Sequence, residues 1–153
     1  MALLKNYPVE AIKSYEKVIQ IYGTLLSELY PSLEDEGSEY REFKEKETTI
    51  VLNLCQCLIQ LKKDWPKIVD YCTKVVDDKF VKCKNAKVFF RRAFANIELM
   101  NREQAFADLE EVMKLDASIP TKKSCAKLKE KMVRYEKERD GCLKDKLKNA
   151  FLV

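Results

Sequence analysis

The sequence predicts an all-α protein: a superhelical stack of antiparallel helix pairs, closed by one long C-terminal helix. Only three glycines and four prolines occur in 153 residues, too few for the tight turns that join the strands of a sheet. Apolar residues recur at spacings of three and four through most of the chain, which is the period of an amphipathic helix. The pattern of one helix pair also returns after about 38 residues, as in proteins built from helical repeats.

The first predicted repeat covers residues 1–30 and is truncated. Residues 1–5 look like the end of a helix. From Pro8, whose ring suits a first helical turn, an apolar stripe runs at helical spacing to the end of the repeat. An acidic loop over residues 31–38 follows, and residues 24–47 as a whole are an insertion between the first two repeats.

Two further repeats are predicted over residues 39–78 and 84–116. Each pairs a first helix with a second one of the same apolar spacing. In the later repeat, the turn at Asn101 has a spacing to Gln104 that resembles a capping box. A last helix over residues 121–150 is expected to cover the apolar end of the stack, because terminal elements of a repeat array must shield it from water.

The predicted helix pairs resemble one another residue by residue. When Asn53 is superposed on Arg91, Cys72 falls on Leu109 once a single residue is skipped in the turn. Tyr15 takes the same place in the first repeat. This internal repeat favours a stacked right-handed array of helical hairpins.

Lys87 and Arg91 are the candidate binding residues. They are four residues apart, so both project from the same side of one helix. An exposed helix that pairs with nearby acids such as Glu98 would explain them without any ligand. Asn53 stands at the equivalent position of the preceding repeat, which favours a clamp for carboxylates. Arg92 is expected to serve helix packing or a structural ion pair.

The helical count places apolar and amide side chains beside these cations. The expected floor of the site consists of Leu52, Gln56, Phe90, Phe94 and Ile97. A peptide with a C-terminal aspartate presents two carboxylates close together, and cations held on rigid helices meet them without reorganisation. The residues therefore predict a groove for the acidic end of a polypeptide.

The composition disfavours catalysis and metal binding. There is no histidine, the commonest general base and zinc ligand, and no C-x-x-C pair among the six cysteines. Cys55 and Cys57 face opposite sides of a helix, so core packing is favoured over a joint metal site. We expect a reduced, cytoplasmic protein without cofactor or enzymatic activity.

Membrane and nucleic-acid binding are also disfavoured. No apolar run approaches the length of a membrane span. From residue 121 onward there are eleven Lys and Arg against five Asp and Glu. These charges are interspersed and no aromatic row accompanies them, so a solvated helix face is favoured over a nucleic-acid surface.

Four stretches carry a resemblance to a known family: VLNLCQC (51–57), KIVDYCTKVV (67–76), AKVFFRRA (86–93) and AFADLEEVMKLD (105–116). They resemble the tetratricopeptide-repeat domain of the aryl-hydrocarbon-receptor-interacting protein family, which are immunophilin-like co-chaperones. The spacing here is about 38 residues rather than the usual 34 or so. The resemblance also implies that the chain is a fragment of a longer protein, with a peptidyl-prolyl-isomerase-like domain upstream.

The resemblance implies a partner and a role for each candidate residue. Such domains hold the acidic C-terminal tail, of -EEVD type, of the ninety-kilodalton heat-shock protein. Asn53 would bond the terminal carboxylate region, and Lys87 and Arg91 would meet carboxylates and the peptide backbone. A Lys and an Asn from the first helix of repeat one complete the clamp in the family and have no counterpart here.

A second function is also open from the sequence, namely a scaffold that docks a client receptor or enzyme. Its contacts would be the insertion over residues 24–47 and the end of the last helix, where Leu143, Leu147 and Phe151 have little to pack on.

Overall fold

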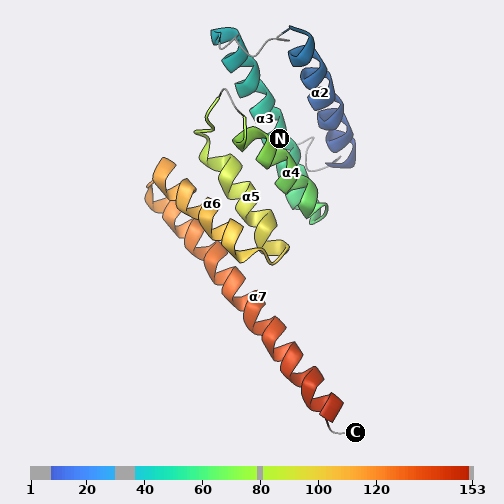
Figure 1. The fold of residues 1–153 in the computed structure, drawn as a ribbon, viewed down its shortest axis with the longest axis vertical. Helices are drawn as coiled ribbons and strands as arrows, with labels where there is room; N and C mark the ends of the chain where they lie inside the picture. Colours follow the sequence, from blue (N-terminus) through green and yellow to red (C-terminus); the bar gives the residue numbers. More distant parts are fainter. Residues whose placement is uncertain (1–7, 30–36, 79–80, 152–153) are drawn as a thin grey trace.

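The computed structural model describes residues 8–29, 37–78 and 81–151. All regular structure in these ranges is helical, which confirms the predicted all-α superhelix (Figure 1). The helices in chain order are α2 (Pro8–Leu29), α3 (Ser38–Leu61), α4 (Trp65–Val76), α5 (Ala86–Glu98), α6 (Arg102–Leu115) and α7 (Ile119–Phe151). The helix end expected within residues 1–5 and most of the acidic loop expected over residues 31–38 lie outside the described ranges.

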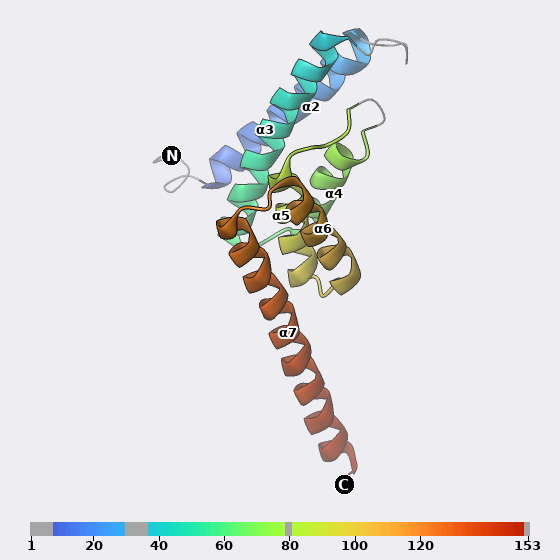
Figure 2. The same ribbon diagram turned by 90° about the vertical axis from the view of Figure 1, so that its left-hand side faces the viewer.

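Each helix packs against the next one along the chain, and α5 also contacts α3 and α7. Figure 2 shows the resulting stack, in which the pair α2 and α3 is followed by α4, α5 and α6, with α7 running along the far end. Because α3 and α5 each lie between neighbours on both sides, their apolar surface is wider than that of a helix at the surface. These two helices therefore form the centre of the molecule.

The repeat equivalence expected from the sequence is visible as equal burial. Ile68 and Cys72 on α4 and Ala105 and Leu109 on α6 are all completely buried. Removing a leucine-sized side chain from water stabilises a fold by about 1.5–3 kcal/mol, so these positions hold the hairpins together. The corresponding stripe on α2 is less covered, and Tyr15 is only half-buried.

The turns between helices depend on residues in left-handed conformation. Lys62 closes α3 at φ 51°, Asp64 precedes α4 at φ 55°, and Met100 joins α5 to α6 at φ 63°. None of these is a glycine, so each conformation costs on the order of 1 kcal/mol and is imposed by the packing of the flanking helices.

The predicted capping box between Asn101 and Gln104 is wrong. No side-chain bond from Asn101 caps α6. Its side-chain amide instead donates to Asn96 Oδ1 at 3.3 Å, and its backbone N–H donates to the Asn96 carbonyl at 2.8 Å. The left-handed turn at Met100 causes this, because it directs Asn101 back toward the end of α5 rather than forward along α6.

A buried ion pair fastens α5 to α6, as expected for Arg92. Its Nε donates to Asp108 Oδ2 at 2.8 Å and its Nη2 to Oδ1 at 2.7 Å, while Nη1 donates to the Thr73 hydroxyl on α4 at 3.2 Å. The hydrogen bond that Arg92 donates to the Asp108 carboxylate raises the pKa of Arg92. Of the two adjacent arginines, Arg92 therefore has a structural role, because both prongs of its contact with Asp108 lie inside the protein.

The first half of α7 closes the stack and the second half extends beyond it. Cys125, Leu128 and Met132 are buried against α5 and α6. The rest of α7 continues away from the body (Figure 1). None of the helices in the described ranges is both long and apolar enough to cross a membrane.

Candidate functional site

The site begins at the N-terminus of α5, which places Lys87 and Arg91 on one side of the helix. Asn85 caps this helix, since its Oδ1 accepts the backbone N–H of Lys87 at 3.1 Å. Lys87 is exposed, and it forms no ion pair with any residue of the described ranges. Its ammonium is therefore available to an anion.

Arg91 is half-buried and crosses from α5 to α3. Its Nη1 donates to the backbone carbonyl of Leu52 at 2.6 Å. Burial lowers the pKa of its guanidinium, but arginine stays charged at neutral pH because its ordinary pKa lies above about 12. One N–H is used by the carbonyl, and the other donors of the fork have no hydrogen-bond partner among the described residues.

Asn53 follows Leu52 directly on α3, so the guanidinium of Arg91 reaches the turn of α3 that carries Asn53. Asn53 is exposed, and Gln56 one turn later is half-buried. Lys87, Arg91 and Asn53 thus belong to the neighbouring helices α5 and α3, as the superposition of the repeats predicts.

Two members of the expected floor are not available to a ligand. Leu52 is buried in the core cluster formed by α2, α3, α4 and α5, and Ile97 is completely buried in the cluster formed by α5, α6 and α7. The prediction that they line the site is wrong because α3 and α5 are covered on two sides, so their apolar stripes extend well past the open face.

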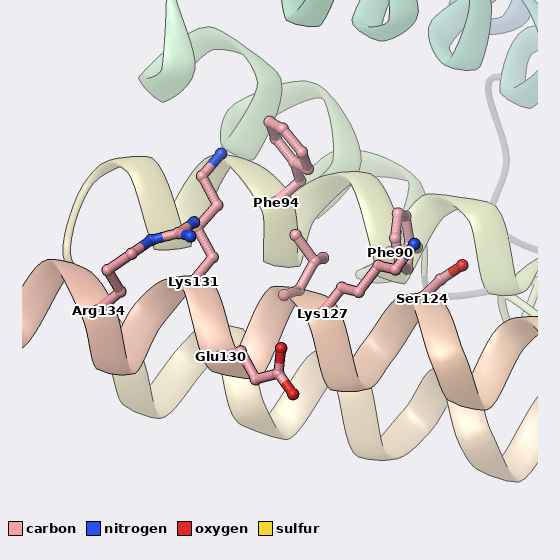
Figure 3. Close-up of a pocket in the computed structure, with 8 residues that line it drawn as sticks. Phe90, Phe94, Ser124, Lys127, Glu130, Lys131 and Arg134 are labelled. Carbon is pink, nitrogen blue, oxygen red and sulfur yellow. The ribbon is translucent and has the colours of Figure 1, made fainter.

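Phe90 and Phe94 do line an open groove, which lies between α5 and α7 and has a volume of about 450 Å³ (Figure 3). Both phenyl rings are half-buried. The ring of Phe94 packs against the ring of Trp65 at the start of α4, with ring centroids 5.8 Å apart. Rings held in this way offer a rigid apolar floor at low entropic cost to a bound chain.

The opposite wall of the groove carries cations that the sequence reasoning missed. Lys127, Lys131 and Arg134 project from α7 toward the groove, and the Lys131 ammonium lies 4.7 Å from the centre of the Phe94 ring. Their spacing of four and three residues is the signal that could have identified them, since it places all three on one face of a helix. The segment is rich in lysine throughout, so this spacing does not stand out in the sequence.

Glu98, the acid considered as a partner for Lys87 and Arg91, has other partners. It forms an ion pair with Lys131 and accepts a hydrogen bond from the Tyr135 hydroxyl at 3.2 Å. Burial alone would lower the pKa of Lys131, but the hydrogen bond and charge of Glu98 raise it overall. This contact ties the C-terminal end of α5 to α7 and leaves the cations at the other end of α5 without that acid.

The described cysteines are all free thiols. Cys55 and Cys57 are both buried, as expected for core residues. The Sγ atoms of Cys55 and Cys72 lie 3.9 Å apart, and this contact together with burial raises the pKa of Cys72. Within the described ranges, no group of three or more His, Cys, Asp or Glu side chains is placed to hold a metal ion.

The apolar residues considered for client docking lie on one face of the distal half of α7. Leu143 is 51% exposed, Leu147 57% and Phe151 86%. The distal half of α7 extends away from the other helices (Figure 1), so its exposed apolar face is a second surface, separate from the groove.

Comparison with known proteins supports a relationship over part of the chain. No protein-family profile matches it. It is 30% identical over 81 residues to aryl-hydrocarbon-interacting protein-like 1 of Mus musculus and of Rattus norvegicus, and 31% identical over 71 residues to the Bos taurus protein. The first two matches cover 53% of this chain and 24% of the relative. The chain thus spans about a quarter of the length of the relatives it matches, and the similarity agrees with the resemblance seen in its motifs.

Proposed function

We propose that this chain is a non-catalytic, cytoplasmic interaction module that binds the acidic C-terminal tail of a chaperone, of the -EEVD type found on the ninety-kilodalton heat-shock protein. The similarity to aryl-hydrocarbon-interacting protein-like 1 supports a role in protein interaction. The observation that carries the proposal is the cationic face of α5, whose Arg91 reaches α3 beside Asn53 while Phe90 and Phe94 continue it as an apolar floor.

In this mechanism the terminal residue of the tail binds first. Its two carboxylates accept from the ammonium of Lys87 and from the free N–H groups of Arg91, and the Asn53 amide donates to the same end. Charge-assisted bonds of this kind are about twice as strong as neutral ones. The carbonyl of Leu52 already holds the Arg91 guanidinium, so little side-chain entropy is lost when the ligand arrives.

The apolar side chains of the tail then rest on the floor. Phe90 and Phe94 lie one turn apart along α5 and are both half-buried. Gln56 on α3 offers an amide to the peptide backbone. A short peptide held mainly by charge should bind with a dissociation constant on the order of 1–100 μM and weaken as salt is added.

Calorimetric titration of an -EEVD peptide tests the proposal. We expect Lys87→Glu to abolish binding, because it places a carboxylate where the ligand's carboxylate must lie. Lys13→Glu on α2 is the matched control, since it changes the net charge equally at an exposed position on another helix. Circular dichroism should stay helical in both variants. Unchanged affinity in Lys87→Glu would remove the proposal.

A conservative substitution is needed at Arg91, because its hydrogen bond to the Leu52 carbonyl also joins α5 to α3. Arg91→Lys keeps the charge and loses the fork. We expect peptide affinity to fall about three- to tenfold, while the unfolding midpoint changes little.

The alternative is a scaffold that docks a client receptor or enzyme. The exposure of Leu143, Leu147 and Phe151 on one helical face favours it. Within the insertion over residues 24–47, Phe43 packs edge-on against Tyr22 with ring centroids 6.0 Å apart, which fixes part of that segment to α2. Deleting residues 141–153 discriminates between the two functions, since it should remove client capture and leave peptide binding intact.

A further inference from the structure

We propose that Lys127 and Arg134 bind acidic side chains upstream of the ligand's terminal carboxylate, so that the module selects tails with an acidic run before the final residues. This inference rests on the proposed function, because it concerns the same groove. It assigns a role to residues of α7 and names a further property of the ligand.

The position of these cations is the first argument. Lys127 and Arg134 line the groove opposite Phe90 and Phe94. Figure 3 shows their side chains on the same side of α7 as the two phenyl rings, while the carboxylate of Glu130 points away from the rings. A peptide that continues from the α5 cations across the floor must pass along this wall.

The charge state of the wall is the second argument. Lys131 is neutralised by Glu98. Neither Lys127 nor Arg134 forms an ion pair with a residue of the described ranges, and both side chains are exposed. Two cations that form no ion pair with a described residue therefore line a groove with an apolar floor and a single carboxylate, Glu130, which favours an anionic ligand that also has apolar side chains.

The rigidity of the wall is the third argument. On the same turns of α7, Cys125, Leu128 and Met132 are buried in the core that α7 shares with α5 and α6, and Leu128 also reaches the groove. The ion pair between Lys131 and Glu98 holds the next turn to α5. A cation on a fixed helix pays less entropy to bind a carboxylate than one on a loop.

The spacing of the wall fits an extended peptide. Arg134 lies seven positions after Lys127, a span of about 10 Å along the helix at a rise of ~1.5 Å per residue. An extended chain covers that distance in about three residues. Acidic side chains that far apart, upstream of the clamped terminus, can each meet one cation.

Three peptides in a calorimetric titration of the full chain test the inference. One is a short peptide ending -EEVD, the second has a run of glutamates before the same ending, and the third has glutamines in place of that run. We expect the glutamate peptide to bind about three- to tenfold more tightly than the glutamine peptide. The advantage should shrink as salt is added.

The double variant Lys127→Ala/Arg134→Ala should abolish this advantage and leave the short peptide within about twofold of its original affinity. Lys122→Ala is the control, because Lys122 is exposed and does not line the groove. It should keep the full advantage. An advantage that persists in the double variant, or an absent advantage in the unmodified chain, overturns the inference.

The same titrations distinguish a failure of this inference from a failure of the proposed function. If the short peptide binds and Lys87→Glu abolishes its binding, the clamp stands whatever the upstream residues do. If the glutamate peptide binds equally well with a C-terminal amide and in Lys87→Glu, the clamp proposal fails, and the inference that rests on it is overturned as well.

Discussion

The two halves of α7 share one apolar spacing and differ completely in surroundings. In the proximal half, up to Tyr135, Leu128 is buried against α5 and α6. In the distal half Leu147 occupies the same kind of position and remains more than half exposed. The difference teaches that an apolar period predicts a helix and its face, whereas the neighbours in the fold decide whether that face is covered.

The two halves also support different functions. The proximal half presents Lys127 and Arg134 to the groove while its other side is anchored in the core. The distal half carries Leu143, Leu147 and Phe151, whose side chains are all exposed. One continuous helix thus offers a rigid wall for a peptide and, beyond it, an apolar surface suited to a protein partner.

The largest expected contrast is between the same substitution in the two halves. Leu128→Ala should destabilise the fold by about 2–5 kcal/mol, because it removes buried methyl groups and leaves a cavity. Leu147→Ala should stay within about 0.5 kcal/mol of the unmodified protein, as surface substitutions do. Denaturant unfolding followed by circular dichroism measures both. Similar losses at the two sites would show that the distal half packs as tightly as the proximal one.

The sequence predicts more of the fold than of the site. The burial of Cys72 and Leu109 at equivalent positions follows from the repeat, and the structural role of Arg92 follows from the direction it faces on α5. These features depend on local periodicity and on the repetition of one hairpin. They can be predicted without knowing the angles at which helices distant in the sequence cross.

The features that the sequence did not predict depend on contacts between helices. Arg91 donates to the Leu52 carbonyl because of the way α5 crosses α3, and Lys127 and Arg134 line the same groove as Phe90 because of the way α7 crosses α5. No local spacing specifies a crossing angle or which face of α7 turns toward the groove.

A smaller contrast should separate the two cysteines of α7 at alkaline pH. Burial raises the pKa of the Cys125 thiol in the folded state above its ordinary value of about 8.5. The unfolded chain then releases the proton first, so stability is fully present below about pH 8.5 and falls as the pH rises further, by at most ~1.4 kcal/mol per pH unit. Cys142 is exposed.

Urea unfolding at neutral and alkaline pH, with a reductant present, measures this effect. Cys125→Ala should lose less stability on going to alkaline pH than the unmodified chain, and Cys142→Ala should lose the same amount. Equal pH dependence in all three proteins would mean that the Cys125 thiol ionises as readily in the fold as in water.

The smallest expected effect concerns two helical glycines. A Cβ added to Gly23 on α2 or to Gly141 on distal α7 meets no atom within 4 Å. Alanine favours a helix over glycine by about 0.5–1 kcal/mol. Gly23→Ala should raise the global unfolding midpoint, because α2 packs on the core. Gly141→Ala should raise helix content by circular dichroism without moving that midpoint, since the distal half can open by itself. A matching rise in midpoint for Gly141→Ala would contradict the separation of the two halves.

The central claim is that the groove recognises the free end of a polypeptide by its charge. One calorimetric comparison tests it most directly: the same acidic peptide ending -EEVD, once with its terminal carboxylate and once as a carboxamide. Loss of that carboxylate should weaken binding at least about tenfold, because it removes a charge-assisted partner of Lys87 and Arg91. Equal affinity for the two peptides would contradict the account.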